Sequence, residues 1–344
     1  MRQLLNTLYV STEGAWLRLE GETLIVKIED EKRLQVPLHH LGAVVCIGQV
    51  GMSPALMARN AEDGRSTVWL SRSGHFQARV EGPAGGNILL RQAQYRAADD
   101  PQTPLELARA FIAAKLRNSR HNLLRSARDS KDTNDSDVLK RCAEQLAINL
   151  RNLEHAGNLD TVRGLEGDAA RLYFAQINTM LKPALRQGFN FNGRNRRPPR
   201  DPINALLSFL YALLLTDCRS ALESVGLDPQ LGFLHAVRPG RPALALDLLE
   251  EFRAPLADRL ALTLINRRQI SNKDFDFNEG GSVLLNADGR RTVLTAYQER
   301  KQETLTHPLL EQTVEIGLLP LLQARLLARH LRGDTEAYIP YLQK

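Results

Sequence analysis

Three acidic side chains and one histidine are the residues of this chain best suited to chemistry. His235 lies just ahead of a leucine-rich segment that carries Asp247 and Glu250, and Glu166 lies upstream in the segment VRGLEGDAARLYF. Carboxylates and an imidazole are ligands for a divalent cation, and this set favours Mg²⁺ or Mn²⁺ over zinc, for which thiolates are more usual. Asp247 and Glu250 share one side of a predicted helix because they are three residues apart. We therefore predict a metal-dependent catalytic site built from these four residues, in which the imidazole and two or three of the carboxylates are the metal ligands.

Each of these residues also has an ordinary structural explanation. Glu166 alone is typical of a solvated glutamate at a helix start, and a lone histidine such as His235 is usually a packed or surface imidazole. Asp247 lies in the apolar run ALALDLLEE, where a carboxylate is costly to bury unless it is paired or bound to a metal. It is equally suited to accept a hydrogen bond from Arg241 or a backbone amide, and Glu250 to form the acidic rim of an amphipathic helix. Only their combination favours a metal site.

Positive charge is concentrated beside these candidates. The whole chain carries a net charge of +6, and residues 163–200 alone hold eight Lys and Arg against two acids. A local positive field of this kind suits an anionic polymer such as DNA. The segment FNFNGRNRRPPRDP is typical of a solvated loop, but it leads directly into an apolar helix with a polar stripe. The predicted nucleic-acid-binding residues are Arg163, Arg194, Arg196, Arg197, Arg200, Asn204 and Tyr211.

Other function classes receive no support from the sequence. The chain has no Walker loop, Rossmann glycine pattern, Gly-x-Ser-x-Gly elbow or zinc-finger spacing, which removes the usual signals for ATP hydrolysis, hydride transfer and serine hydrolysis. Its three cysteines are widely separated, as expected for reduced thiols rather than for a disulfide frame. No apolar run reaches the roughly 20 residues that cross a bilayer, so we expect a cytoplasmic protein with no membrane partner.

The pattern of apolar residues predicts an α+β protein. The first hundred residues alternate apolar and polar side chains between turns, with one helix at 53–63 capped by Ser53. We predict a β-rich domain at 1–97, a linker at 98–104 and a larger, all-helical domain at 105–344 that carries the catalytic residues. The expected helices cover 105–128, 136–154, 160–186, 202–224, 243–266 and 307–332, with a mobile loop at 126–137 and a hairpin turn at Asp288-Gly289.

Four long segments, in order along nearly the whole chain, resemble the Cas-one family of CRISPR-associated integrases and endonucleases, most closely its type I-C branch. They are RGLEGDAARLYF, GRNRRPPRDPINALLSFLYALL, GLDPQLGFLHAVRPGRPALALDLLEEFR and YQERKQETLTHP. The resemblance implies a metal held by Glu166, His235 and an acid of the following helix. That last ligand is aspartate in much of the family, whereas Glu250 stands at the matching position here and Asp247 matches a supporting acid. The resemblance also implies a homodimer through the β-domain, joined by the small Cas-two protein in a heterohexamer.

The preferred function is therefore a metal-dependent DNA integrase that inserts short captured DNA, called spacers, into a CRISPR repeat array. A 3′-hydroxyl would attack a phosphodiester, and such a transesterification needs no ATP because the number of bonds is conserved. A nuclease that acts on branched DNA, with water replacing the hydroxyl, would use the same residues. A DNA-binding scaffold whose acids are structural is the alternative from another class, and it predicts that metal removal leaves function intact.

Overall fold

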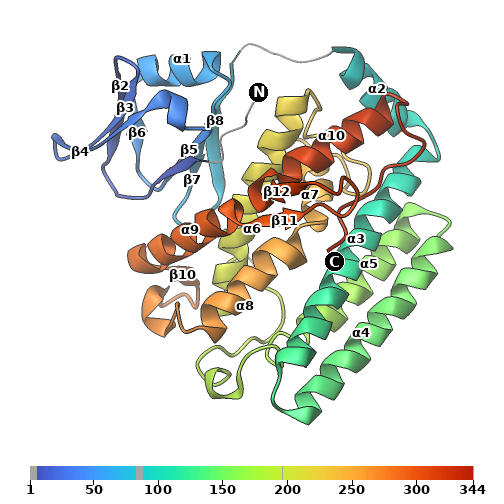
Figure 1. The fold of residues 1–344 in the computed structure, drawn as a ribbon. Helices are drawn as coiled ribbons and strands as arrows, with labels where there is room; N and C mark the ends of the chain where they lie inside the picture. Colours follow the sequence, from blue (N-terminus) through green and yellow to red (C-terminus); the bar gives the residue numbers. More distant parts are fainter. Residues whose placement is uncertain (1–5, 83–87, 196, 344) are drawn as a thin grey trace.

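The computed structural model describes residues 6–82, 88–195 and 197–343. Its N-terminal part consists of strands, drawn in blue in Figure 1, and the rest is mostly helical. The strands form two four-stranded sheets, with orders β1-β5-β7-β8 and β4-β3-β2-β6. Their bounds are β1 (Thr7–Val10), β2 (Trp16–Glu20), β3 (Thr23–Ile28), β4 (Glu31–Pro37), β5 (Ala43–Ile47), β6 (Gly51–Met52), β7 (Ser66–Leu70) and β8 (Phe76–Val80).

Alternating side chains explain why this segment forms half-buried sheets. Leu17, Leu24 and Val26 contribute to a small core of their own, because successive side chains of a strand point to opposite faces. Helix α1 (Pro54–Glu62) packs against β2 and β7. The Ser53 side chain accepts a hydrogen bond from the Leu56 amide at 3.3 Å, and Pro54 takes the first helical position. The helix predicted at 53–63 is thus confirmed.

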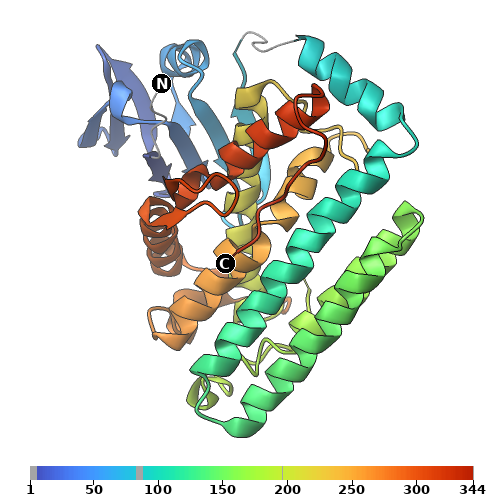
Figure 2. The same ribbon diagram turned by 45° about the vertical axis from the view of Figure 1, so that its right-hand side comes forward.

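The helical part is built around one apolar helix, α6 (Pro202–Val225), which contacts α7, α10 and β10. By length and composition α6 is able to span a membrane, but 61% of its most apolar window is buried inside the protein, as in a core helix. Two long helices, α3 and α4, run side by side in both views (Figure 2). The helices are α2 (Ile88–Asp99), α3 (Thr103–Asp129), α4 (Thr133–Glu154), α5 (Leu159–Phe174), α7 (Ala243–Glu250), α8 (Arg259–Asn266), α9 (Ala287–Gln302) and α10 (Leu319–Leu331).

Several predicted helix bounds are wrong, each for a local reason. The polar segment 126–137 is not a long loop, because α3 continues to Asp129 and Asp132 caps α4 by accepting from the amides of Asn134 and Asp135. Helix α5 ends at Phe174, well before 186, and the helix predicted at 243–266 is interrupted. Its central turn, η3 (Arg253–Asp258), is a π-helix that contains Pro255, and proline cannot donate an ordinary helical hydrogen bond.

The C-terminal part is mostly helical rather than all-helical. It contains two small antiparallel hairpins, β9 (Phe275–Phe277) with β10 (Val283–Leu285), and β11 (Thr304–Thr306) with β12 (Thr313–Glu315). The second hairpin occupies the start of the helix predicted at 307–332. Asp288-Gly289 is not a hairpin turn, because Asn286 accepts a hydrogen bond from the Gly289 amide at 2.9 Å and so caps α9.

The chain changes from strand to helix before the predicted linker. Strand β8 ends at Val80, and α2 already occupies Ile88–Asp99. The proline-containing segment does separate two helices, since α2 ends at Asp99 and α3 begins at Thr103. The division into domains at 1–97, 98–104 and 105–344 stays a prediction, whereas the α+β class with strands first is observed.

Candidate metal and DNA site

The predicted ligands come from α5, from the loop ahead of α7, and from the end of α7. Glu166 lies on α5, which begins at the Asn158 cap, His235 lies in the loop, and Glu250 is the last residue of α7. Helix α3 packs against both α5 and α7. Segments far apart in the sequence therefore meet along one side of α3.

A lysine of α3 joins the carboxylates of this cluster. The Lys115 ammonium is in contact with Glu166 Oε1 and lies 2.8 Å from Glu250 Oε2. His235 Nε2 faces the Glu250 carboxylate, 3.9 Å from its Oε1. Side-chain exposure falls from 31% at Glu166 to 4% at Glu250, so the cluster opens to solvent on the Glu166 side. Lys115 was not predicted from the sequence, because a lysine on an amphipathic helix carries no signal for a buried position.

Asp247 positions His235. The Asp247 side chain is fully buried, and its Oδ2 accepts hydrogen bonds from the amides of Phe233 at 2.6 Å and Leu234 at 3.0 Å. Its Oδ1 lies 3.0 Å from the His235 amide and 2.6 Å from His235 Nδ1. Both carboxylate oxygens of Asp247 thus accept hydrogen bonds from backbone amides, which is one of the structural roles considered for this residue from the sequence. With Nδ1 held by Asp247, the ring directs Nε2 toward Glu250.

The loop that carries His235 also requires a glycine. A Cβ atom added to Gly232 would lie 2.7 Å from both the backbone carbon of Ala243 and Asp247 Oδ2. From the other side, the Arg163 guanidinium donates to the Leu234 carbonyl at 2.8 and 3.1 Å. Arg163, predicted to bind nucleic acid, therefore also fixes this loop.

Glu250 is ionised in spite of its burial. Burial alone would raise the pKa of its carboxyl, but Arg253, Lys115 and His235 together outweigh that effect and lower the pKa to about 2. The closest contact with Arg253 joins its guanidinium to Glu250 Oε1 at 3.0 Å. A carboxylate held in its charged form at neutral pH is a ready ligand for a cation.

The π-helical turn after α7 carries another buried acid, Asp258, near Arg253. The Arg253 guanidinium lies over the Tyr211 ring, 4.9 Å from its centre, and the Tyr211 hydroxyl donates to Asp258 Oδ1 at 2.5 Å. Burial raises the pKa of Asp258 to about 6, against the hydrogen bonds of Tyr211 and Tyr173, which lower it. Arg253 is thus held between Tyr211 and Glu250, and sequence reasoning missed it.

The basic loop divides into buried and exposed residues. Arg194 donates to Asn204 Oδ1 at 2.7 Å and to Ser208 Oγ at 3.1 Å, and its guanidinium lies 5.4 Å from the centre of the Tyr211 ring. Asn204 and Tyr211 are themselves buried. Arg197 and Arg200 are exposed, whereas Arg196 lies outside the described residues. Among the described residues of this loop that were predicted to contact DNA, Arg197 and Arg200 are the ones that a phosphate backbone can reach.

The cluster fits a divalent cation in chemistry and charge. The Lys115 ammonium occupies the position between the Glu166 and Glu250 carboxylates. Its carboxylate and imidazole donors suit Mg²⁺ or Mn²⁺. Within residues 6–82, 88–195 and 197–343, no group of three or more His, Cys, Asp or Glu is arranged to hold a metal ion. The three cysteines are free, buried and remote from this arrangement in the sequence.

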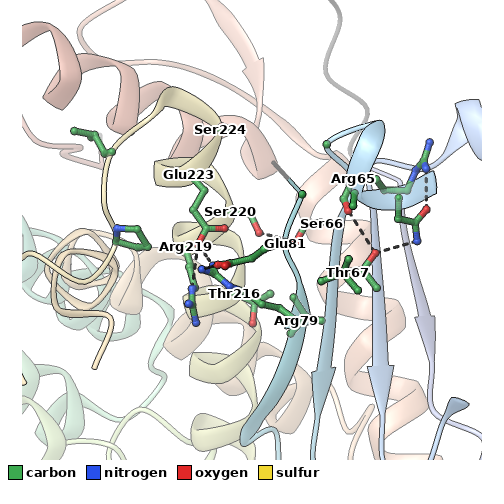
Figure 3. Close-up of a pocket in the computed structure, with 18 of the residues that line it drawn as sticks. Arg65, Ser66, Thr67, Arg79, Glu81, Thr216, Arg219, Ser220, Glu223 and Ser224 are labelled. Atoms are coloured by element: carbon green, nitrogen blue, oxygen red, sulfur yellow. Dashed lines mark hydrogen bonds and ion pairs between the residues drawn. The ribbon is translucent and has the colours of Figure 1, made fainter. Parts of the chain in front are cut away.

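A separate cavity of about 560 Å³ lies between β7, β8 and the second half of α6 (Figure 3). Arg79 contacts both Glu81 and Glu223, and Arg219 contacts Glu223 at 3.2 Å. Ser66 and Ser220 share a hydrogen bond of 2.9 Å across the cavity. None of the predicted site residues lines this cavity, and its labelled arginines already have carboxylate partners.

Residues 8–299 match the model of a protein family described as "CRISPR associated protein Cas1". The CRISPR-associated endonuclease Cas1 1 of Moorella thermoacetica is 51% identical over 344 residues, covering 100% of both chains. This chain belongs to the Cas1 family. It is therefore an enzyme of the CRISPR-associated endonuclease class, as the resemblance predicted, while the type I-C branch stays a prediction.

Two solved structures share the Cas1 fold. A casposase bound to its integration product has a TM-score of 0.83 at 22% identity, covering 98% of this chain and 94% of the other. A Cas6-RT-Cas1–Cas2 complex contains a chain with a TM-score of 0.83 at 25% identity, covering 99% of this chain and 36% of that one. These similarities extend over the strands as well as the helices, in agreement with the α+β prediction.

Proposed function

We propose that this Cas1 protein is a metal-dependent DNA integrase that inserts spacers into a CRISPR repeat array. The 3′-oxygen of a short captured DNA forms a bond to a phosphorus of the repeat, and the bond from that phosphorus to its original 3′-oxygen breaks. One phosphodiester is lost and one is gained, so no ATP is needed. The observation that carries the proposal is that Glu166 and Glu250 meet at one cation, the Lys115 ammonium, with His235 Nε2 3.9 Å from Glu250 Oε1.

The proposed ligands of the Mg²⁺ or Mn²⁺ ion are the Glu166 and Glu250 carboxylates and His235 Nε2. Two features of the chain support this choice: Glu250 is kept ionised, and a positive charge is already stabilised between the two glutamates. When bound, the ion would lower the pKa of the attacking hydroxyl and offset charge on the phosphorane and the departing oxygen.

The surrounding residues prepare this reaction. Asp247 holds Nδ1 of His235 and so keeps the Nε2 lone pair available, as carboxylate partners of ligating histidines commonly do. Arg253 adds a fixed positive charge beside Glu250 that can oppose the negative charge that develops on a transferring phosphate. Arg197 and Arg200, exposed on the basic loop, bind the DNA backbone.

The proposed partners are DNA, a second copy of the chain and Cas2. The casposase structure is bound to an integration product, and the second structural relative is part of a complex with Cas2. The heterohexamer, with dimers formed through the β-rich domain, and the cytoplasmic location remain predictions from the sequence. Hydrolysis of branched DNA is the second candidate function, favoured by the endonuclease name of the full-length relative.

A joining assay tests the proposal. Supercoiled repeat DNA, a short duplex with 3′-hydroxyl ends, the protein and Cas2 are combined with Mg²⁺ or Mn²⁺, and joined strands are measured. We expect joining to disappear with EDTA and in Glu166→Ala and His235→Ala, with fold and DNA affinity largely kept. A matched duplex with 3′-deoxy ends should not be joined.

The outcomes separate the candidate functions. Joining that survives metal removal would refute the metal-dependent mechanism, and DNA binding without joining or cutting would support the scaffold alternative. Metal-dependent cutting without joining would support the nuclease. Wild-type joining by either alanine variant would show that the ligand assignment is wrong.

A further inference from the structure

Lys115 is the central cation of the cluster. It lies near the middle of α3, and only 11% of its side chain is exposed. Its ammonium bridges Glu166 of α5 and Glu250 of α7, two carboxylates that would repel each other without it. Removing an ammonium from water is costly unless it is paired. The two carboxylates compensate the cost of burying the Lys115 ammonium, and the ammonium in turn reduces the repulsion between them.

A divalent cation at the proposed site would need the same carboxylate oxygens. Two positive charges a few ångströms apart repel strongly in a partly buried environment. Lys115 and the ion therefore compete, and binding of the ion requires the ammonium to leave. Lysine can do so because its charge sits on a flexible four-carbon stem with freely rotating donors.

Arg253 cannot make the same movement. Its guanidinium is held between Glu250 Oε1, at 3.0 Å, and the Tyr211 ring. The two cations next to Glu250 thus have different properties: Arg253 is fixed by packing on both sides, whereas Lys115 is held by its charge partners. Only Lys115 is free to exchange one negatively charged partner for another.

We propose that Lys115 is a built-in counter-ion that holds Glu166 and Glu250 together before the metal binds, is displaced by the metal, and then binds a phosphate of the DNA. This inference rests on the proposed metal site. It makes metal binding and DNA binding mutually supportive, because a DNA phosphate gives the displaced ammonium a new partner. Thermodynamic linkage then requires each ligand to raise the affinity for the other.

Mn²⁺ binding, measured by the electron paramagnetic resonance signal of the free ion, tests the proposal without any catalytic readout. The full-length wild type, Lys115→Met and Lys115→Gln are titrated with Mn²⁺ in the absence and presence of a short DNA duplex. The control is Lys301→Met, because Lys301 is equally buried and lies 3.0 Å from Asp217 on another part of the fold.

We expect both Lys115 variants to bind Mn²⁺ on the order of tenfold more tightly than the wild type without DNA, since a competing unit charge is removed. DNA should tighten Mn²⁺ binding to the wild type and to Lys301→Met, but should have a much smaller effect on the Lys115 variants. In EDTA, Lys115→Met should have a lower melting temperature than the wild type. Mn²⁺ should raise the melting temperature of Lys115→Met by more than it raises that of the wild type.

Two results would be decisive against these ideas, and they differ. If Lys115→Gln binds Mn²⁺ no more tightly than the wild type, the counter-ion role alone is overturned. This variant is included because glutamine keeps a hydrogen-bond donor that supports folding. A wild type and a set of variants that all fail to bind Mn²⁺ in the presence of DNA would overturn the metal site, and with it the proposed function.

Discussion

Substitution of Asp247 by asparagine should destabilise the whole site. In the wild type, Oδ2 of Asp247 accepts from the amides of Phe233 and Leu234, while Oδ1 accepts from the amide of His235 and faces its Nδ1. Asparagine has only one oxygen, so its NH₂ group faces either the amides of Phe233 and Leu234, or the amide of His235 together with Nδ1, which accepts a hydrogen bond when the ring carries its proton on Nε2. One or two hydrogen bonds to a charged acceptor are lost, at about 1.5–3 kcal/mol each.

Guanidinium unfolding followed by circular dichroism measures this loss. The control is Asp160→Asn, whose wild-type carboxylate is 94% exposed and pairs with Arg163 at 3.0 Å. Joining activity, measured where Asp247→Asn is still folded, should fall because His235 is no longer oriented. A decrease of less than about 1 kcal/mol in the free energy of unfolding, with normal joining, would refute this account of Asp247.

Three further predictions concern charge and assembly. Glu250 has a pKa lowered from 4.5 to about 2, so its carboxylate contributes stability that is present above 4.5 and is lost as pH falls toward 2. Acid unfolding should therefore be steeper in that window for the wild type than for Glu250→Gln, and parallel curves would contradict the assignment. Arg197→Ala with Arg200→Ala should weaken DNA binding and reduce the slope of log affinity against log salt by about two, whereas Arg194→Ala should mainly lower thermal stability; an unchanged slope would leave the exposed loop without a DNA role. The full chain should be a dimer by light scattering at micromolar concentration, and a monomer would contradict dimerisation through the β-rich domain.

The elements that follow a regular period were predictable, and those set by tertiary contacts were not. Helices α1 and α6 have a side-chain cap at Ser53 or Asp201 and a proline in their first turn, signals that are local to the sequence. The hairpin β11–β12 and the π-helical turn have no comparable signal, since short strands and an irregular turn gain their stability from packing.

The site shows the same limit. Glu166, His235 and Glu250 were recognisable because their residue types suit a metal, and Asp247 because an acid in an apolar run needs a partner. Lys115 was not recognisable, since its role depends on α3 crossing two other helices. The basic loop was predicted as one surface, but its first arginine turns inward onto Tyr211 because Asn204 and Ser208 offer acceptors there.

The irregular turn after α7 makes α3 and the end of α7 an inseparable pair for protein engineering. Asn118 donates to the Glu251 carbonyl at 2.8 Å and Asn122 to the Ala254 carbonyl at 2.6 Å, so two amides of α3 bind backbone acceptors on either side of the point where the π-helix begins. Lys115 lies about one helical turn from Asn118 and about two turns from Asn122 on the same helix. A chimaera that takes α3 from one Cas1 protein and residues 243–258 from another would therefore have to preserve the 115, 118 and 122 spacing together with the π-helical turn. For this chain, the exchangeable unit is a matched pair of segments rather than a single helix.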